Sequence, residues 1–266
     1  MNAENDEAAN GAASEAARGW CRRCRCWHWL GWGTSLAYAR RLIEQLAQKR
    51  TLANGVTDMR LTTDSLFLPG GGKMFGILVG ADQAGNEVVL RAFSGQYNSL
   101  FTAPGWSPPL FPAEEYQRLI AEADERIKAL TAQMSVLDVH DSRRAQLRQQ
   151  RQTISRALMP RLHSLYRLHN PHGETASIFE AWAGPGGIPT GAGDCCAPKL
   201  LCEAARQNLR PLGICEFFFG DGGQGERARR HLGIYAACAA KCQPLLGFLL
   251  CGLDDALTTK EMGGKP

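Results

Sequence analysis

Three cysteines in the last third of the sequence have the spacing of metal ligands. Cys195 lies just before an expected helix, and Cys238 and Cys242 lie at the start of another, with an apolar segment between the two. A spacing of four residues puts two side chains on one face of a helix. Thiolates are preferred ligands of Zn²⁺. The pattern therefore predicts a zinc site formed by these three cysteines.

Glu216 lies in the apolar segment between the two cysteine motifs and is the candidate proton carrier. The order of motifs resembles that of zinc deaminases, in which one ligand begins one helix and two cysteines begin the next. Those enzymes carry a glutamate two residues after the first ligand, where this chain has Ala197. The cysteine pair is also Cys-x₃-Cys rather than Cys-x₂-Cys. Two alternatives stay open: Glu216 as a structural partner of Lys199 or Arg206, and the cysteines as buried thiols of a structural or redox-sensitive protein.

A second group of possible metal ligands lies near the N-terminus. Cys21 and Cys24 form a Cys-x-x-Cys motif, and Cys26 and His28 follow closely among several tryptophans. These residue types could ligate a metal. The alternative is an aromatic-rich tail, and we expect residues 1–34 to be disordered or loosely ordered.

A run of arginines occupies a segment that contains no acidic residue between its first and last members. Arginines on a helix attract phosphates with little sequence preference, which favours RNA binding. Alternatively, the acidic residues of a neighbouring helix neutralise them: Glu114, Glu115, Glu122, Asp124 and Glu125. The candidate RNA-binding residues are Arg143, Arg144, Arg148, Arg151, Arg156, Arg161 and Arg167, with Arg229 and Arg230 as a second cluster.

The elements that would position these residues follow from periodicity. Two runs rich in β-forming residues around the turn at Gly85 and Asn86 predict a β-hairpin, and a continuous apolar run predicts a buried strand. Apolar residues at steps of three and four predict the helices. We expect an α/β (or α+β) fold, a deaminase-like sandwich, as a single domain over residues 35–253 with a C-terminal tail at 254–266. The expected elements are a helix from Ser35, a hairpin at 75–93, an inserted helical hairpin at about 113–169, a helix at 196–207, a strand at 212–219 and a helix at 238–253.

The first helix of the insertion carries a narrow apolar stripe typical of a coiled coil. The stripe could pack within the chain or against a second copy. Its members are Tyr116, Ile120, Ala123, Ile127, Leu130, Met134 and Leu137.

Composition and charge limit the possible partners and location of the protein only coarsely. The net charge of +4 indicates no partner by itself, and the first ten residues lack the basic start of a secretory signal. The longest apolar run, residues 245–253, is too short to span a membrane. We therefore expect a cytoplasmic protein with no membrane partner, whose ten cysteines are thiols or metal ligands rather than disulfides.

Six ordered segments resemble the N-terminal extension of bacterial RluA-family RNA pseudouridine synthases. The likeness covers roughly residues 35–253, and in that family the cysteines matching Cys195, Cys238 and Cys242 lie in this extension. The segments are 73–79 (KMFGILV), 92–96 (AFSGQ), 108–111 (PPLF), 191–201 (GAGDCCAPKLL), 211–220 (PLGICEFFFG) and 235–247 (YAACAAKCQPLLG).

The resemblance implies a role in RNA modification without isomerase chemistry. The family's catalytic aspartate belongs to a following domain with a His-Arg-Leu-Asp-type motif, which this sequence does not contain. We expect a non-catalytic RNA-binding or accessory module, acting on tRNA or rRNA alone or beside a separate pseudouridine synthase. The main alternative is a zinc-dependent hydrolase of a nucleobase or nucleotide.

Overall fold

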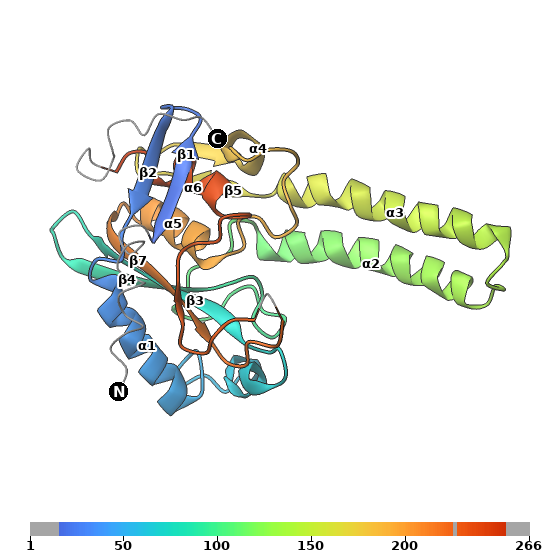
Figure 1. Ribbon diagram of the computed structural model, residues 1–266, viewed down its shortest axis with the longest axis horizontal. Coiled ribbons are helices and arrows are strands. Elements are labelled where there is room, and N and C mark those ends of the chain that lie inside the picture. Colours follow the sequence, from blue (N-terminus) through green and yellow to red (C-terminus); the bar gives the residue numbers. More distant parts are fainter. Residues whose placement is uncertain (1–15, 226–227, 254–266) are drawn as a thin grey trace.

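The computed structural model describes residues 16–225 and 228–253, and a four-stranded sheet lies at its centre (Figure 1). The strand order is β4-β3-β7-β8, and all of these pairings are antiparallel. The strands are β3 (Lys73–Ala81), β4 (Glu87–Phe93), β7 (Arg210–Phe219) and β8 (Ile234–Tyr235). Helices and sheets together confirm the mixed α/β class, and the antiparallel pairing corresponds to its α+β form. The finer likeness to deaminases stays a prediction.

The two faces of the sheet are covered by different helices. On one face, α1 (Ser35–Lys49) packs over β3 and β7, above inward-facing residues such as Phe75 and Phe217. On the other face lies α5 (Cys196–Arg206). It approaches closely because β3 has a glycine beneath it: a β-carbon on Gly76 would lie 2.6 Å from the β-carbon of Cys196.

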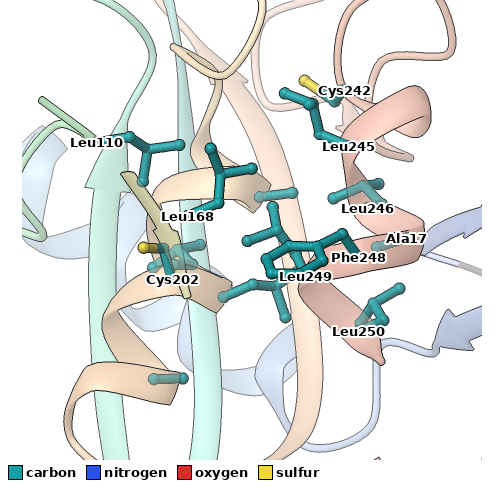
Figure 2. Packing of buried hydrophobic residues seen from close by; sticks show 14 of the residues in the cluster. Ala17, Leu110, Leu168, Cys202, Cys242, Leu245, Leu246, Phe248, Leu249 and Leu250 are labelled. Atoms are coloured by element: carbon teal, nitrogen blue, oxygen red, sulfur yellow. The ribbon is translucent and has the colours of Figure 1, made fainter. Parts of the chain in front are cut away.

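A third layer covers α5. The helix α6 (Gln243–Leu250) packs its leucines towards α5 and towards Leu168, as Figure 2 shows. A second hairpin, β1 (Ala17–Cys21) and β2 (Cys26–Leu30), lies against the other side of α6. Shorter elements complete the core: the 3₁₀ turns Met59–Leu61 and Asp64–Phe67, β5 (Arg167–His169), β6 (Thr175–Ser177) and α4 (Ile178–Ala181).

The expectation of a loose tail is wrong for residues 16–34. Ala17, Cys21 and Leu30 are buried because β1 and β2 pair with each other and cover α6. Residues 1–15 and 254–266, for which tails are also expected, lie outside the described residues.

An antiparallel pair of helices, called here the arm, projects from the core (Figure 1). It consists of α2 (Ala113–Ser135) and α3 (Ser142–His163), and it occupies the region of the expected helical insertion. Every member of the predicted apolar stripe on α2 is buried or half-buried. Since α2 contacts α3, the stripe packs within the chain.

The last helix is shorter than expected. It begins at Gln243, so Cys238 and Cys242 do not lie on one helical face. They instead flank a turn in which the amide groups of Cys242 and Gln243 both donate to the carbonyl oxygen of Cys238, at 3.1 and 3.0 Å. Pro244 explains the late start, because proline is tolerated only in the first turn of a helix.

Candidate metal centres and the basic arm

The three cysteines predicted as metal ligands lie near the start of α5, but they do not form a group whose ligand atoms all lie within 4.8 Å of one another among the described residues. Cys195 is the N-cap residue of α5, and Cys242 is that of α6. Cys195 and Cys238 are half-buried, whereas Cys242 is fully buried. The thiols lie close enough to shift one another's ionisation.

The electrostatics of these thiols single out one of them. Interaction with Cys238 raises the pKa of Cys195 to about 12, and interactions with Cys195 and Cys238 raise the pKa of Cys242 as well. Interactions with both neighbours lower the pKa of Cys238 below its usual range. Cys238 is therefore the thiol of this group that ionises first, and a thiolate is the form that binds metal.

Glu216 reaches this group from the neighbouring strand β7. It is only 5% exposed, and its Oε1 accepts a hydrogen bond of 2.8 Å from the backbone amide of Ala197. Ala197 lies in the first turn of α5, where amide groups lack helical partners and Cys195 makes no side-chain cap. The carboxyl group of Glu216 thus takes the place of an N-cap. Burial raises its pKa to about 7, against the lowering effect of this bond.

The structural partners expected for Glu216 are different from those observed. The Nζ of Lys199 donates instead to the carbonyl oxygens of Phe93 and Gly95, both at 3.0 Å. Arg206 pairs with Glu203 at 4.0 Å along its own helix. Glu216 instead interacts with the start of α5 and, electrostatically, with Cys238 and Arg229.

Residues of the N-terminal motif form a second group of possible ligands, together with Cys251, which the sequence pattern did not predict. The ligand atoms of Cys21, Cys24, His28 and Cys251 all lie within 4.8 Å of one another. This set could bind a metal ion. Cys26 does not belong to it, and its thiol donates instead to the carbonyl oxygen of Cys24 at 3.4 Å.

The ionisation of these thiols is strongly perturbed. Burial opposes the charged form of Cys21, but hydrogen bonds with His28 and with the backbone of Cys24 and Arg23 lower its pKa to about 6. Burial and the nearby Cys21 raise the pKa of Cys24 to about 11. Burial also raises the pKa of Cys251.

The seven arginines predicted to bind RNA between Arg143 and Arg167 fall into two groups, and all but Arg167, which lies on β5, are on the arm. Four make local contacts: Arg143 pairs with Asp141 at 2.6 Å, Arg161 lies 3.9 Å from Glu122, and Arg144 and Arg167 donate to backbone carbonyl groups. The other three, Arg148, Arg151 and Arg156, lie along the middle of α3. Arg148 and Arg156 are exposed, and Arg151 is half-buried.

Neutralisation of α3 by the acidic residues of α2 is slight. Within residues 16–225 and 228–253, the ion pair that joins the two helices is that of Arg161 and Glu122, at the long distance of 3.9 Å between surface groups. Such exposed pairs contribute little. The middle of α3 therefore keeps its positive charge.

The second basic cluster is differently arranged. The guanidinium of Arg229 lies 4.6 Å from the ring centroid of Tyr235, and the backbone amide of Arg230 donates to the hydroxyl of the same tyrosine. Arg229 is half-buried and Arg230 exposed, on the loop between β7 and β8.

Aromatic residues connect the root of the arm to the cysteine group at α5. Phe111 stacks on Tyr116 of α2 with ring centroids 4.0 Å apart, and Tyr166 packs against Phe111 at 4.8 Å. The hydroxyl of Tyr166 donates to Oδ1 of Asp194 at 2.6 Å, directly before Cys195. The arm is thus fixed to the same loop that carries the first predicted ligand.

Comparison of the chain with protein-family models, with curated proteins and with solved structures found no match. Among the described helices, none is both long and apolar enough to cross a membrane.

Proposed function

We propose that this protein is a non-catalytic RNA-binding module of RNA modification, and that the arm is its main RNA contact. The observation that carries the proposal is the positive charge in the middle of α3, away from the ion pairs of Arg143 and Arg161. Six arginines and no acidic residue lie on this helix, and Arg148, Arg151 and Arg156 occupy the middle of its length. Each phosphate that such a residue neutralises releases counterions, which gives affinity for any RNA backbone.

The resemblance to the N-terminal extension of RluA-family pseudouridine synthases supports the same context. The partners would be tRNA or rRNA and, in the cell, a separately encoded synthase. Residues 1–266 contain no His-Arg-Leu-Asp-type motif, so we expect no conversion of uridine to pseudouridine by this chain alone.

The test is RNA binding as a function of salt. Fluorescence anisotropy with labelled tRNA and with an rRNA hairpin, from 50 to about 300 mM KCl, gives the affinity and its salt slope. A triple variant, Arg148→Gln with Arg151→Gln and Arg156→Gln, should bind on the order of tenfold more weakly. Its salt slope should fall by about 2 to 3, because three phosphate contacts are lost.

A matched control removes the same charge elsewhere. Arg40, Arg41 and Lys49 are exposed on α1, away from the arm in Figure 1. Their triple replacement by glutamine should leave affinity and slope nearly unchanged. Absence of binding at low salt, or an equal loss in the control, would contradict the proposal.

A second candidate function is that of a zinc-dependent hydrolase acting on a nucleobase or nucleotide. The favouring observation is the buried carboxyl group of Glu216 beside the three thiols, with a pKa of about 7. Zinc held by Cys195, Cys238 and Cys242 would activate water, and Glu216 would carry protons. The same carboxyl group also serves as the cap of α5, which is why we rank this function second.

The hydrolase is tested by ammonia release from nucleosides, free bases and RNA, with Cys238→Ser and Glu216→Gln as inactive controls. Turnover that needs zinc and both residues would establish it. A folded protein that holds no metal at these cysteines, and releases no ammonia, would exclude it.

A further inference from the structure

A cluster of three thiols and one imidazole joins the two ends of the described chain. Cys21 ends β1, Cys24 lies in the turn before β2, His28 lies on β2, and Cys251 directly follows α6. Their ligand atoms lie within 4.8 Å of one another. The elements that bring them together are the hairpin and the helix beneath it.

From this geometry we propose that Cys21, Cys24, His28 and Cys251 form a structural zinc site. Three sulfur atoms and one nitrogen are a frequent ligand set of structural zinc, and soft thiolates select against magnesium or calcium. Zinc–sulfur bonds of about 2.3 Å in a tetrahedron place two sulfur atoms about 3.8 Å apart. The Sγ atoms of Cys24 and Cys251 are 3.8 Å apart.

The imidazole of His28 faces the thiols of the cluster with one of its two ring nitrogens. The Nε2 of His28 lies 3.0 Å from the Sγ of Cys24, and its Nδ1 is buried without a hydrogen-bond partner among the described residues. A buried imidazole with an unpaired nitrogen is costly. Zinc would bind the other nitrogen, Nε2, because this is the ring atom that faces the thiol of Cys24.

Neighbouring cations do not occupy the site. Arg22 turns to the carbonyl oxygen of Trp182 at 3.0 Å, and Arg23 pairs with Glu174 at 2.8 Å. Both contacts draw the turn of the hairpin towards other segments and leave the thiols facing one another.

The role of the ion is structural because the four side chains complete its coordination. Cys21, His28 and Cys251 are at most 5% exposed. A catalytic zinc keeps an open position for water or substrate, whereas a structural one is closed by four protein ligands. The ion would fix residues 17–30 to the end of α6, two segments that the sequence separates by more than two hundred residues. This inference does not depend on RNA binding.

The first measurement is the metal content of the full-length protein by mass spectrometry after dialysis, with point variants. Cys21→Ser and His28→Ala should each lose about one zinc per chain relative to the wild type. Cys26→Ser is the matched control, because Cys26 lies in the same hairpin outside the cluster, and it should keep that zinc. Cys238→Ser reports the separate site at α5, so that a second metal there is counted independently.

Cobalt substitution checks the geometry. Co²⁺ in a thiolate-rich tetrahedral site gives sulfur-to-metal absorption bands that the Cys26→Ser variant should retain and Cys21→Ser should lose. Absence of metal from the wild type, or an equal loss in Cys26→Ser, would overturn the proposal.

Alkylation keeps the test valid if the ligand variants fail to fold. Cys24 and Cys26 are both exposed. In zinc-loaded wild-type protein, iodoacetamide should label Cys26 and spare Cys24, and a chelator should make Cys24 reactive. Equal labelling of the two in the presence of zinc would overturn the proposal.

Discussion

Gly19 of β1 and Gly247 of α6 lie backbone against backbone. A β-carbon on Gly19 would lie 2.2 Å from the amide nitrogen of Gly247, and one on Gly247 would lie 2.0 Å from the carbonyl oxygen of Trp20. Real β-carbons do not approach other atoms so closely. These two glycines therefore set how near the N-terminal hairpin comes to α6, and with it the distance from Cys21 to Cys251.

Gly247→Ala should destabilise the protein by roughly 3 kcal/mol, because the hairpin must move off the helix. Alanine favours a helix interior over glycine by about 1 kcal/mol, so local propensity alone predicts a gain instead. Urea unfolding shows whether the free energy of unfolding falls or rises. Gly187→Ala is the control, since no atom lies within 4 Å of a β-carbon there. A stabilised Gly247→Ala variant would contradict the close packing.

Shortening the arm should separate binding from folding. The outer halves of α2 and α3 stand clear of the core in Figure 1, whereas Leu119 and Leu162 near the root are buried. Replacement of residues 124–154 by a short Gly/Ser linker should lower RNA affinity on the order of tenfold or more. The melting temperature of the core should change by only a few degrees. A core that no longer unfolds cooperatively would show that the arm is part of the folding unit.

Glu216→Gln should flatten the dependence of stability on pH. The folded pKa is about 7, above the usual value of 4.5. As the pH rises from 4.5 to about 7, the unfolded chain loses this proton while the folded chain holds it. Stability therefore falls over that interval and stays lower above it.

Glutamine keeps an oxygen for the amide of Ala197 and cannot ionise. Relative to wild type, the variant should gain on the order of 3 kcal/mol between pH 4 and pH 8.5. Urea unfolding at both pH values measures this difference, with the exposed Glu44→Gln as control. Parallel pH profiles for wild type and Glu216→Gln would show that folding does not raise the pKa of this carboxyl group.

Lys199→Met should cost about 2 kcal/mol, although methionine fits the volume. Lys199 is 2% exposed, and its ammonium group satisfies the carbonyl oxygens of Phe93 and Gly95 at the end of β4. Methionine leaves both carbonyl groups buried without a donor. Lys49→Met, at an exposed position of α1, should be nearly neutral. An equal effect at the two positions in urea unfolding would exclude the role assigned to Lys199.

The sequence by itself determined the elements whose pattern is local. Runs rich in apolar, β-forming residues predicted β3, β4 and β7, and helical patterns predicted α1, α2, α3 and α5, with bounds close to those observed. Glu216 could be singled out as a polar residue in an apolar strand. The charge of α3 was also readable, since a count of arginines needs no structure.

The start of the last helix shows a local signal that the sequence contains and that the prediction of a helix from Cys238 did not use. A helix from 238 would place Pro244 in its interior, where the missing amide and the ring break the hydrogen-bond ladder. The observed helix starts at Gln243 for this reason, and Cys238 lies outside it.

Only the tertiary structure decided which cysteines meet. Cys251 lies in an apolar run with no motif around it, yet its Sγ is 3.8 Å from that of Cys24, 227 residues earlier. The hairpin of residues 17–30 is short and rich in half-buried tryptophan and exposed arginine, so its sequence alone favours no order. It is ordered by burial of Ala17, Cys21 and Leu30 against other elements, and by the close glycine contact with α6. Such long-range contacts depend on the packing of the whole chain, which no local pattern encodes.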